Sequence, residues 1–191
     1  MDVLRVLVEE AQCNLEVRSK KGLTPFLVAV QAGQSKALEW MSGSGAEVHA
    51  MLPSGATAMF LAAQEGHIEC VEILHFLGVS LDQPRSDGCT PAFMAAAKGH
   101  YDVINTLGEK GADLLRPNNN GITPLQASTE SNVPHRSETL KALSIHGAGG
   151  NACSATCKQL CRLTIDLLCA CRASSPPSRG DGDSSGDAQR Q

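Results

Sequence analysis

The chain has 191 residues, a length that fits one ordinary domain or a short array of repeats. Hydrophobic residues make up 42% of it and aromatic residues only 3%, so a core has to be built mainly from aliphatic side chains and alanine. The net charge is −4 without a long basic run, which argues against nucleic-acid binding and against adsorption to anionic lipid.

The first residues, Met1–Arg5, lack the basic start and the apolar run of a secretory signal. The longest apolar runs are too short to cross a bilayer, so no membrane insertion is expected. We therefore expect an intracellular, cytoplasmic protein, with the nucleus as an open alternative. In such a compartment the eight cysteines are expected to be free thiols.

A period of 33 residues runs through most of the chain. It separates four glycines, Gly22, Gly55, Gly88 and Gly121. It also separates four threonines, Thr24, Thr57, Thr90 and Thr123, three of which are followed by proline. Further glycines recur inside each period, at Gly33, Gly66 and Gly99 and at Gly45, Gly78 and Gly111. Self-similarity of this length predicts a repeat architecture.

Each recurring residue has a local task. The first glycine suits a turn that needs a positive φ, which costs other residues about 1–2 kcal/mol. Thr-Pro then starts a helix, because threonine caps free N–H groups and proline tolerates the first helical position. Gly66 or Gly99 ends this first helix in the left-handed conformation, and a second apolar helix runs to Gly78 or Gly111.

The phrases Gly88-Cys89-Thr90-Pro91, Gly99-His100 and Gly111-Ala112-Asp113 resemble the ankyrin-repeat family. Its unit is a β-turn followed by two antiparallel helices. The resemblance implies an all-α solenoid of helix-turn-helix units with β-turn fingers. In chain order it covers a partial N-terminal repeat, three complete repeats and a divergent repeat, at residues 2–18, 19–51, 52–84, 85–117 and 118–148.

Two departures from the family pattern stand out. The position of the common Thr-Pro-Leu-His histidine holds Leu27, Phe60, Phe93 and Gln126, and we expect the two phenylalanines to pack between helices. In the fourth unit Asn132 replaces the mid-repeat glycine. About three extra residues, around Val133-Pro134-His135, precede the second helix of that unit.

Stacked units turn the fingers and the first helices into one concave face, and the resemblance implies that a protein partner binds there. The implied function is a protein–protein interaction scaffold. The implied contact residues on the fingers and the outward side of the first helices are Lys20, Lys21, Leu23, Gln31, Ser54, Ala56, Gln64, Glu65, Ser86, Asp87, Cys89, Ala97, Lys98, Asn119, Asn120 and Ile122.

The residues that could take part in catalysis do not form a recognisable active site. His67 and His100 follow mid-repeat glycines, where the family uses histidine structurally, and no triad motif lies near them. Cys70 is expected in the core and Cys89 on a finger surface. We therefore expect no enzyme, no cofactor, no metal and no small-molecule substrate.

Residues 152–172 place Cys153, Cys157 and Cys161 at helical spacing and predict a Cys-rich C-terminal helix. Four interpretations stay open: a helix that caps the stack, a metal site, S-acylation, and a partner-docking helix. The fourth arises because Thr156–Ile165 is similar to the start of a suppressor-of-cytokine-signalling (SOCS) box, although Cys157 and Asp166 depart from that pattern.

In the ankyrin-and-SOCS-box proteins this helix docks elongin C and makes the repeats a substrate receptor. The resemblance therefore offers an alternative function, a substrate-recognition adaptor of an elongin/cullin ubiquitin ligase. Residues 173–191 contain Ser, Pro, Gly, Asp and Arg with no apolar side chain beyond alanine, and we expect them to be disordered.

Overall fold

The computed structural model describes residues 14–130 and 134–147. Within these ranges the regular structure is helical, apart from one isolated antiparallel bridge between Met51 and Thr57. The helices form four consecutive pairs: α2 (Pro25–Gln31) with α3 (Ser35–Gly43), α4 (Ala58–Glu65) with α5 (Ile68–Phe76), α6 (Pro91–Lys98) with α7 (Tyr101–Glu109), and α8 (Pro124–Glu130) with α9 (Arg136–Gly147).

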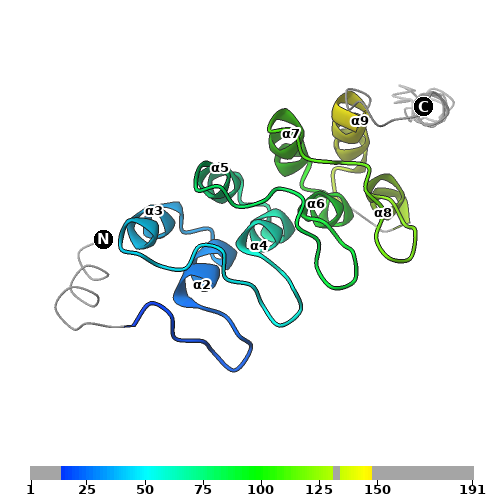
Figure 1. Ribbon diagram of the computed structural model, residues 1–191. Coiled ribbons are helices and arrows are strands. Elements are labelled where there is room, and N and C mark those ends of the chain that lie inside the picture. Colours follow the sequence, from blue (N-terminus) through cyan, green and yellow to red (C-terminus); the bar gives the residue numbers. More distant parts are fainter. Residues whose placement is uncertain (1–13, 131–133, 148–191) are drawn as a thin grey trace, which may run out of the picture.

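The pairs stack side by side in chain order, which confirms the all-α solenoid (Figure 1). The first helices α2, α4, α6 and α8 lie in one row, and the second helices α3, α5, α7 and α9 lie in another. Loops between the pairs project from the lower edge of the view as fingers. Among the described helices, none has the length and apolar character needed to cross a bilayer.

A threonine starts each of the first three helices in the lower row. The Oγ1 atoms of Thr24, Thr57 and Thr90 accept hydrogen bonds from the N–H three residues on, at 3.3, 3.2 and 3.1 Å. Such a cap satisfies a backbone donor that the helix itself leaves free. α4 begins with Ala58 instead of proline and keeps the same cap, so the threonine is the essential part of the start signal.

The fourth helix of this row keeps the threonine cap and adds a second hydrogen bond. Gln126 N donates to Thr123 Oγ1 at 3.3 Å, and Thr123 N donates to the Gln126 side-chain oxygen at 2.9 Å. This reciprocal pair is a capping box, which satisfies two free donors at once. Gln126 therefore has a structural role of its own at the position where the family commonly has histidine.

His67 and His100 tie neighbouring pairs together. Nε2 of His67 lies 3.1 Å from the carbonyl oxygen of Gln31, and Nε2 of His100 lies 3.0 Å from that of Gln64. A Cβ atom on Gly66 would come within 2.6 Å of the His100 ring. Gly66 also ends α4 with a φ of +82°, so glycine is needed there for two separate reasons.

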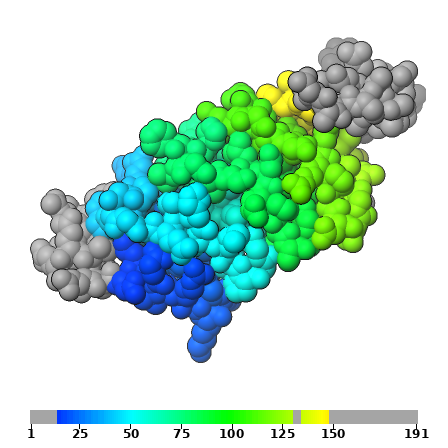
Figure 2. All heavy atoms as spheres, in the orientation of Figure 1, coloured from blue at the N-terminus to red at the C-terminus, as the bar shows by residue number. Residues whose placement is uncertain are grey.

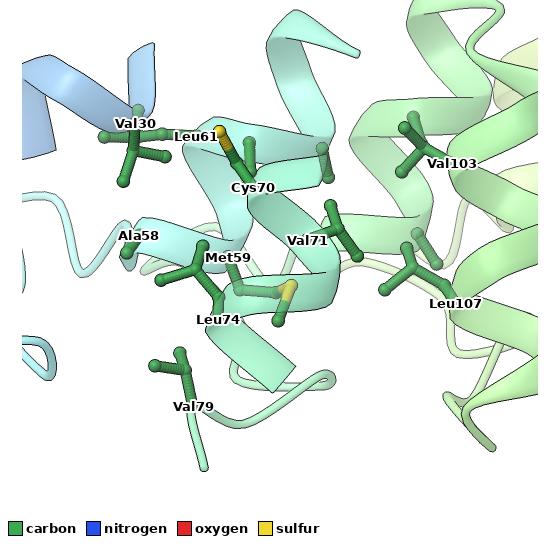
Figure 3. Packing of buried hydrophobic residues seen from close by; sticks show 14 of the residues in the cluster. Val30, Ala58, Met59, Leu61, Cys70, Val71, Leu74, Val79, Val103 and Leu107 are labelled. Atoms are coloured by element: carbon green, nitrogen blue, oxygen red, sulfur yellow. The ribbon is translucent and has the colours of Figure 1, made fainter. Parts of the chain in front are cut away.

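The main core lies between the two rows of helices (Figure 3). Met59 of α4 packs there with Val71 and Leu74 of α5, and Val30 and Leu107 extend the same cluster into the neighbouring pairs. The core is aliphatic and alanine-rich, as the composition predicts. It runs along the stack as one continuous layer, so no pair buries its apolar side chains alone.

The fourth pair departs from the period at its second helix. α9 begins at Arg136, after His135, which has a positive φ of 54°. It still packs closely on α7. Gly108 of α7 allows this close approach, since a Cβ at that position would lie only 2.5 Å from Cγ of His146 in α9. The Asn132 replacement, the predicted helix at 152–172, the tail at 173–191 and most of the partial repeat at 2–18 lie outside the described residues.

Candidate protein-binding surface

Each finger is a tight hairpin closed by two backbone hydrogen bonds. In the third finger, Arg85 N donates to Cys89 O and Gly88 N donates to Arg85 O, both at 2.9 Å. The fingers that start at Ser19, Leu52 and Asn118 have the same two bonds. Their glycines all have φ between +76° and +81°, the left-handed conformation that such a three-residue turn requires. The residues just before each glycine are therefore held at the tip.

The second, third and fourth fingers are also bonded to one another. Ser86 N donates to Ser54 O at 3.0 Å, and Asn119 N donates to Asp87 O at 3.1 Å. The Asn119 side chain adds a bond to Ser86 O at 3.1 Å. A Cβ on Gly88 would lie 2.6 Å from Asn119 N, so the tips lie in direct contact and form one row.

The first finger lacks this backbone link to the second. Residue 53 occupies the position of the donors Ser86 and Asn119, but it is proline and has no N–H to donate. Contact between these two fingers is instead through the Pro53 ring, whose Cδ would lie 2.7 Å from a Cβ on Gly22. The first finger, blue in Figure 2, projects at the lower edge of the molecule.

Most of the implied contact residues reach the surface. Nine are exposed: Lys20, Lys21, Gln31, Ser54, Glu65, Ser86, Lys98, Asn119 and Asn120. Five are partly buried: Leu23, Gln64, Asp87, Ala97 and Ile122. The structure thus brings these fourteen side chains to the fingers and to the outward side or the ends of the first helices.

Two of the implied contact residues are buried, and this corrects the sequence-based assignment. Ala56 and Cys89 follow the finger glycines and pack under the fingers in a second small cluster with Phe60, Phe93 and Ala127. The phenylalanines are buried as expected, but beneath the fingers and not in the main core between the helix rows. Finger periodicity alone misplaced Ala56 and Cys89, because it does not show that this space is filled.

The third finger carries a polar network that the sequence reasoning missed. Arg85 Nε donates to Asp87 Oδ1 at 3.1 Å, and the Arg85 guanidinium carbon lies 5.1 Å from the centroid of the Phe60 ring. Cys89 N also donates to Asp87 Oδ1, at 3.1 Å. The hydrogen bond from Arg85 lowers the pKa of Asp87 well below its usual range. An Arg-x-Asp sequence across the turn is the signal that could have indicated it.

The cysteines and histidines that the sequence singled out among the described residues have structural surroundings. Burial raises the pKa of the Cys70 thiol to about 11, and burial also raises the pKa of Cys89, so both remain protonated. His67 and His100 are engaged in the bonds between neighbouring pairs. No group of three or more metal-ligating side chains occurs in the part of the chain that the structure describes.

Charge is distributed unevenly along the finger row. The first finger presents two exposed cations, Lys20 and Lys21, at its tip. The third finger presents Asp87, which is paired with Arg85, and the fourth presents the uncharged Asn119 and Asn120. The row therefore changes from a cationic end to a neutral polar end.

A family model described as "Ankyrin repeats (3 copies)" matches residues 26–118 and 60–156, which together make up well over half of the chain. A search of the curated proteins finds no match. The matched residues hold the helix pairs from residue 26 on, the second, third and fourth glycine-closed fingers, and the histidine bonds between neighbouring pairs described above. The chain belongs to the ankyrin-repeat family.

Proposed function

We propose that this chain is an interaction scaffold that binds a partner protein through its finger tips and the outward side of its first helices. Ankyrin repeats generally mediate protein–protein interaction. The observation that carries the proposal is the row of exposed polar side chains on fingers that hydrogen-bond to one another from Ser54 to Asn119. These side chains are not needed for the core, and the rigid row reduces the entropy lost on binding.

The composition of the row supports a moderate affinity. The fourteen surface side chains on the fingers and the first helices include no aromatic residue, and buried aromatic anchors usually dominate binding energy. The two cations on the first finger favour a partner that presents carboxylates at that end. Because these lysines are exposed, we expect the association rate to fall as the salt concentration rises.

The proposal is tested by proximity labelling with the full chain in cells. We expect a Lys20→Glu/Lys21→Glu variant, or Lys98→Glu, to lose one or more proteins that the wild type labels. A matched control, Glu72→Lys/Glu109→Lys, changes exposed charges on the second helices and should keep those proteins. Loss with the control but not with the finger variants would contradict the proposal.

A second candidate function rests on the similarity of Thr156–Ile165 to the start of a SOCS box. The family match ends at residue 156, where this segment begins. In this case the chain is a substrate-recognition adaptor of an elongin/cullin ubiquitin ligase. Co-purification of the full chain with elongin B/C tests it, with Leu160→Asp expected to abolish the complex. Absence of a wild-type complex at micromolar concentrations would reject the adaptor function.

A further inference from the structure

The junction between the first and second helix pairs lacks two kinds of hydrogen bond that the repeat provides elsewhere. One is the bond between neighbouring fingers, because Pro53 has no N–H where Ser86 and Asn119 donate to the finger before them. The fingers project along one edge of the stack (Figure 1). Among the described residues, no backbone bond therefore joins the first finger to the second at this edge.

The other missing bond belongs to the turns that follow the second helices. The carboxylates of Glu16 and Asp82 each accept a hydrogen bond from a backbone N–H of the next such turn, at 2.8 and 2.9 Å. His49 stands 33 residues from each of them, at the same position of the period. It is exposed, and in the described part of the chain it makes no bond to Ser80 N, the equivalent donor. The turns of the first and second pairs are thus not linked in this way.

The small apolar cluster beneath the fingers also stops at this junction. Its buried members all come from the second, third and fourth units. Where the second and third units place Phe60 and Phe93 in this cluster, the first unit has Leu27, which belongs to the main core instead. Packing beneath the fingers therefore joins three of the units and leaves the first one out.

A hollow of about 490 Å³ lies between α3 and α5, the second helices at the same junction. Glu39 of α3 and Glu72 of α5 both line it, so charges of the same sign lie on its two sides and oppose closer packing of the helices. At the next junction the equivalent positions hold Glu72 and the uncharged Asn105. The hollow leaves α3 and α5 room to approach or separate.

The junction keeps its apolar core and one histidine bond. Leu61 of α4 is only 6% exposed where α4 packs on α2. Nε2 of His67 lies 3.1 Å from the carbonyl oxygen of Gln31, at the end of α2. These contacts hold the first pair on the stack, and they make the packing of α2 on α4 the pivot for any movement there.

We propose that the stack has a hinge at this junction, where the first pair turns about the α2–α4 contact relative to the second, third and fourth pairs. Those three pairs move as one body, because finger bonds join them from Ser54 to Asn119. The first finger carries Lys20 and Lys21, so the hinge changes the position of the cationic end of the finger row. Its use in fitting a partner rests on the proposed function, whereas the movement itself does not.

Distance measurements on the free full-length chain test the hinge without any partner. Genetically encoded nitroxide amino acids at Lys36 and Asp102, the first label pair, span two junctions that include the proposed hinge. The same labels at Glu69 and Lys141, the reference label pair, span two junctions that do not include it. All four side chains are exposed. We expect double electron–electron resonance to give a broader distance distribution for the first label pair than for the reference pair.

Two reciprocal variants sharpen this test. His49→Asp/Pro53→Ser supplies the carboxylate and the N–H that the junction lacks, and it should narrow the distribution of the first label pair to the width of the reference pair. Asp82→His/Ser86→Pro copies the first junction into the second one and should broaden the reference pair. Equal widths of the two label pairs in the wild type would overturn the proposal, and so would widths that neither variant changes. Neither result depends on whether a partner binds the finger row.

Discussion

The first and second helix pairs follow the same period but lie in different surroundings. In α4, six consecutive residues, Ala58–Ala63, are buried, because α2, α5, α6 and the fingers enclose that helix. In α2, Val28 faces an apolar groove on the outward face of the first helix pair and is half exposed. A residue's place in the stack therefore decides its contribution to stability, even where the local sequence pattern is the same.

The sharpest test of this difference truncates one position in both pairs. We expect Leu61→Ala to lower the free energy of unfolding by about 2–5 kcal/mol, because it opens a cavity between α2 and α4. The equivalent change in the first pair, Val28→Ala, should cost under about 1 kcal/mol, because surface changes are usually small. Urea denaturation measures both. Similar losses would mean that the first pair is as enclosed as the second.

A second test separates backbone strain from packing in the second pair. Gly66 and Gly78 have nearly equal φ angles, +82° and +78°, but a Cβ on Gly66 would meet His100 at 2.6 Å and a Cβ on Gly78 would meet nothing within 4 Å. We expect Gly78→Ala to cost about 1–2 kcal/mol from backbone strain alone. Gly66→Ala should cost clearly more.

Thermal or urea unfolding of both glycine variants checks this prediction. The double variant Gly66→Ala/His100→Ala supplies the control, because removing the ring relieves the contact and should make the two losses less than additive. Fully additive losses would contradict a direct contact between Gly66 and His100.

A smaller effect is expected at the first finger. Pro53→Ser supplies the N–H that Ser86 and Asn119 use to bond their neighbours, so the first finger should gain a bond to the carbonyl of Lys21. Global stability should change little. The new hydrogen bond stabilises the folded protein, but the loss of proline makes the unfolded chain more flexible and costs about 0.4–1 kcal/mol. Trypsin cleavage after Lys20 and Lys21 should become slower. Unchanged cleavage there, with cleavage after Lys98 as the internal reference, would argue against this link.

The smallest effect concerns Asp87. Asp87→Asn should cost under about 1 kcal/mol, since the Arg85–Asp87 pair is partly exposed to water. The folded state lowers the pKa of Asp87, so its contribution is present above the unfolded pKa of about 4 and is lost as pH falls below it. Unfolding curves of wild type and variant should therefore converge in acid. A difference that persists unchanged at low pH would show that the carboxylate charge is not involved.

The repeat architecture and most of the candidate surface could be predicted from the sequence. Glycine, threonine and proline at fixed intervals determine local backbone conformation, so they reveal turns and helix starts without any tertiary information. Tertiary contacts are different. Nothing in the period indicated that Ala56 and Cys89 are covered, because their burial depends on Phe60 and Phe93 from other positions of the repeat. The missing hydrogen bond at Pro53 likewise could not be predicted, because it depends on how the neighbouring finger packs against this one.

Site-specific photo-cross-linking shows whether a partner protein binds the finger row. A photoreactive amino acid would replace Ser54 or Ser86 at the finger tips and, in separate variants, Glu72 or Glu109 on the second helices. We predict that both finger positions cross-link the same protein and that the second-helix positions do not. Cross-linking of a discrete partner from Glu72 or Glu109, with none from the finger tips, would show that the partner binds the second helices instead.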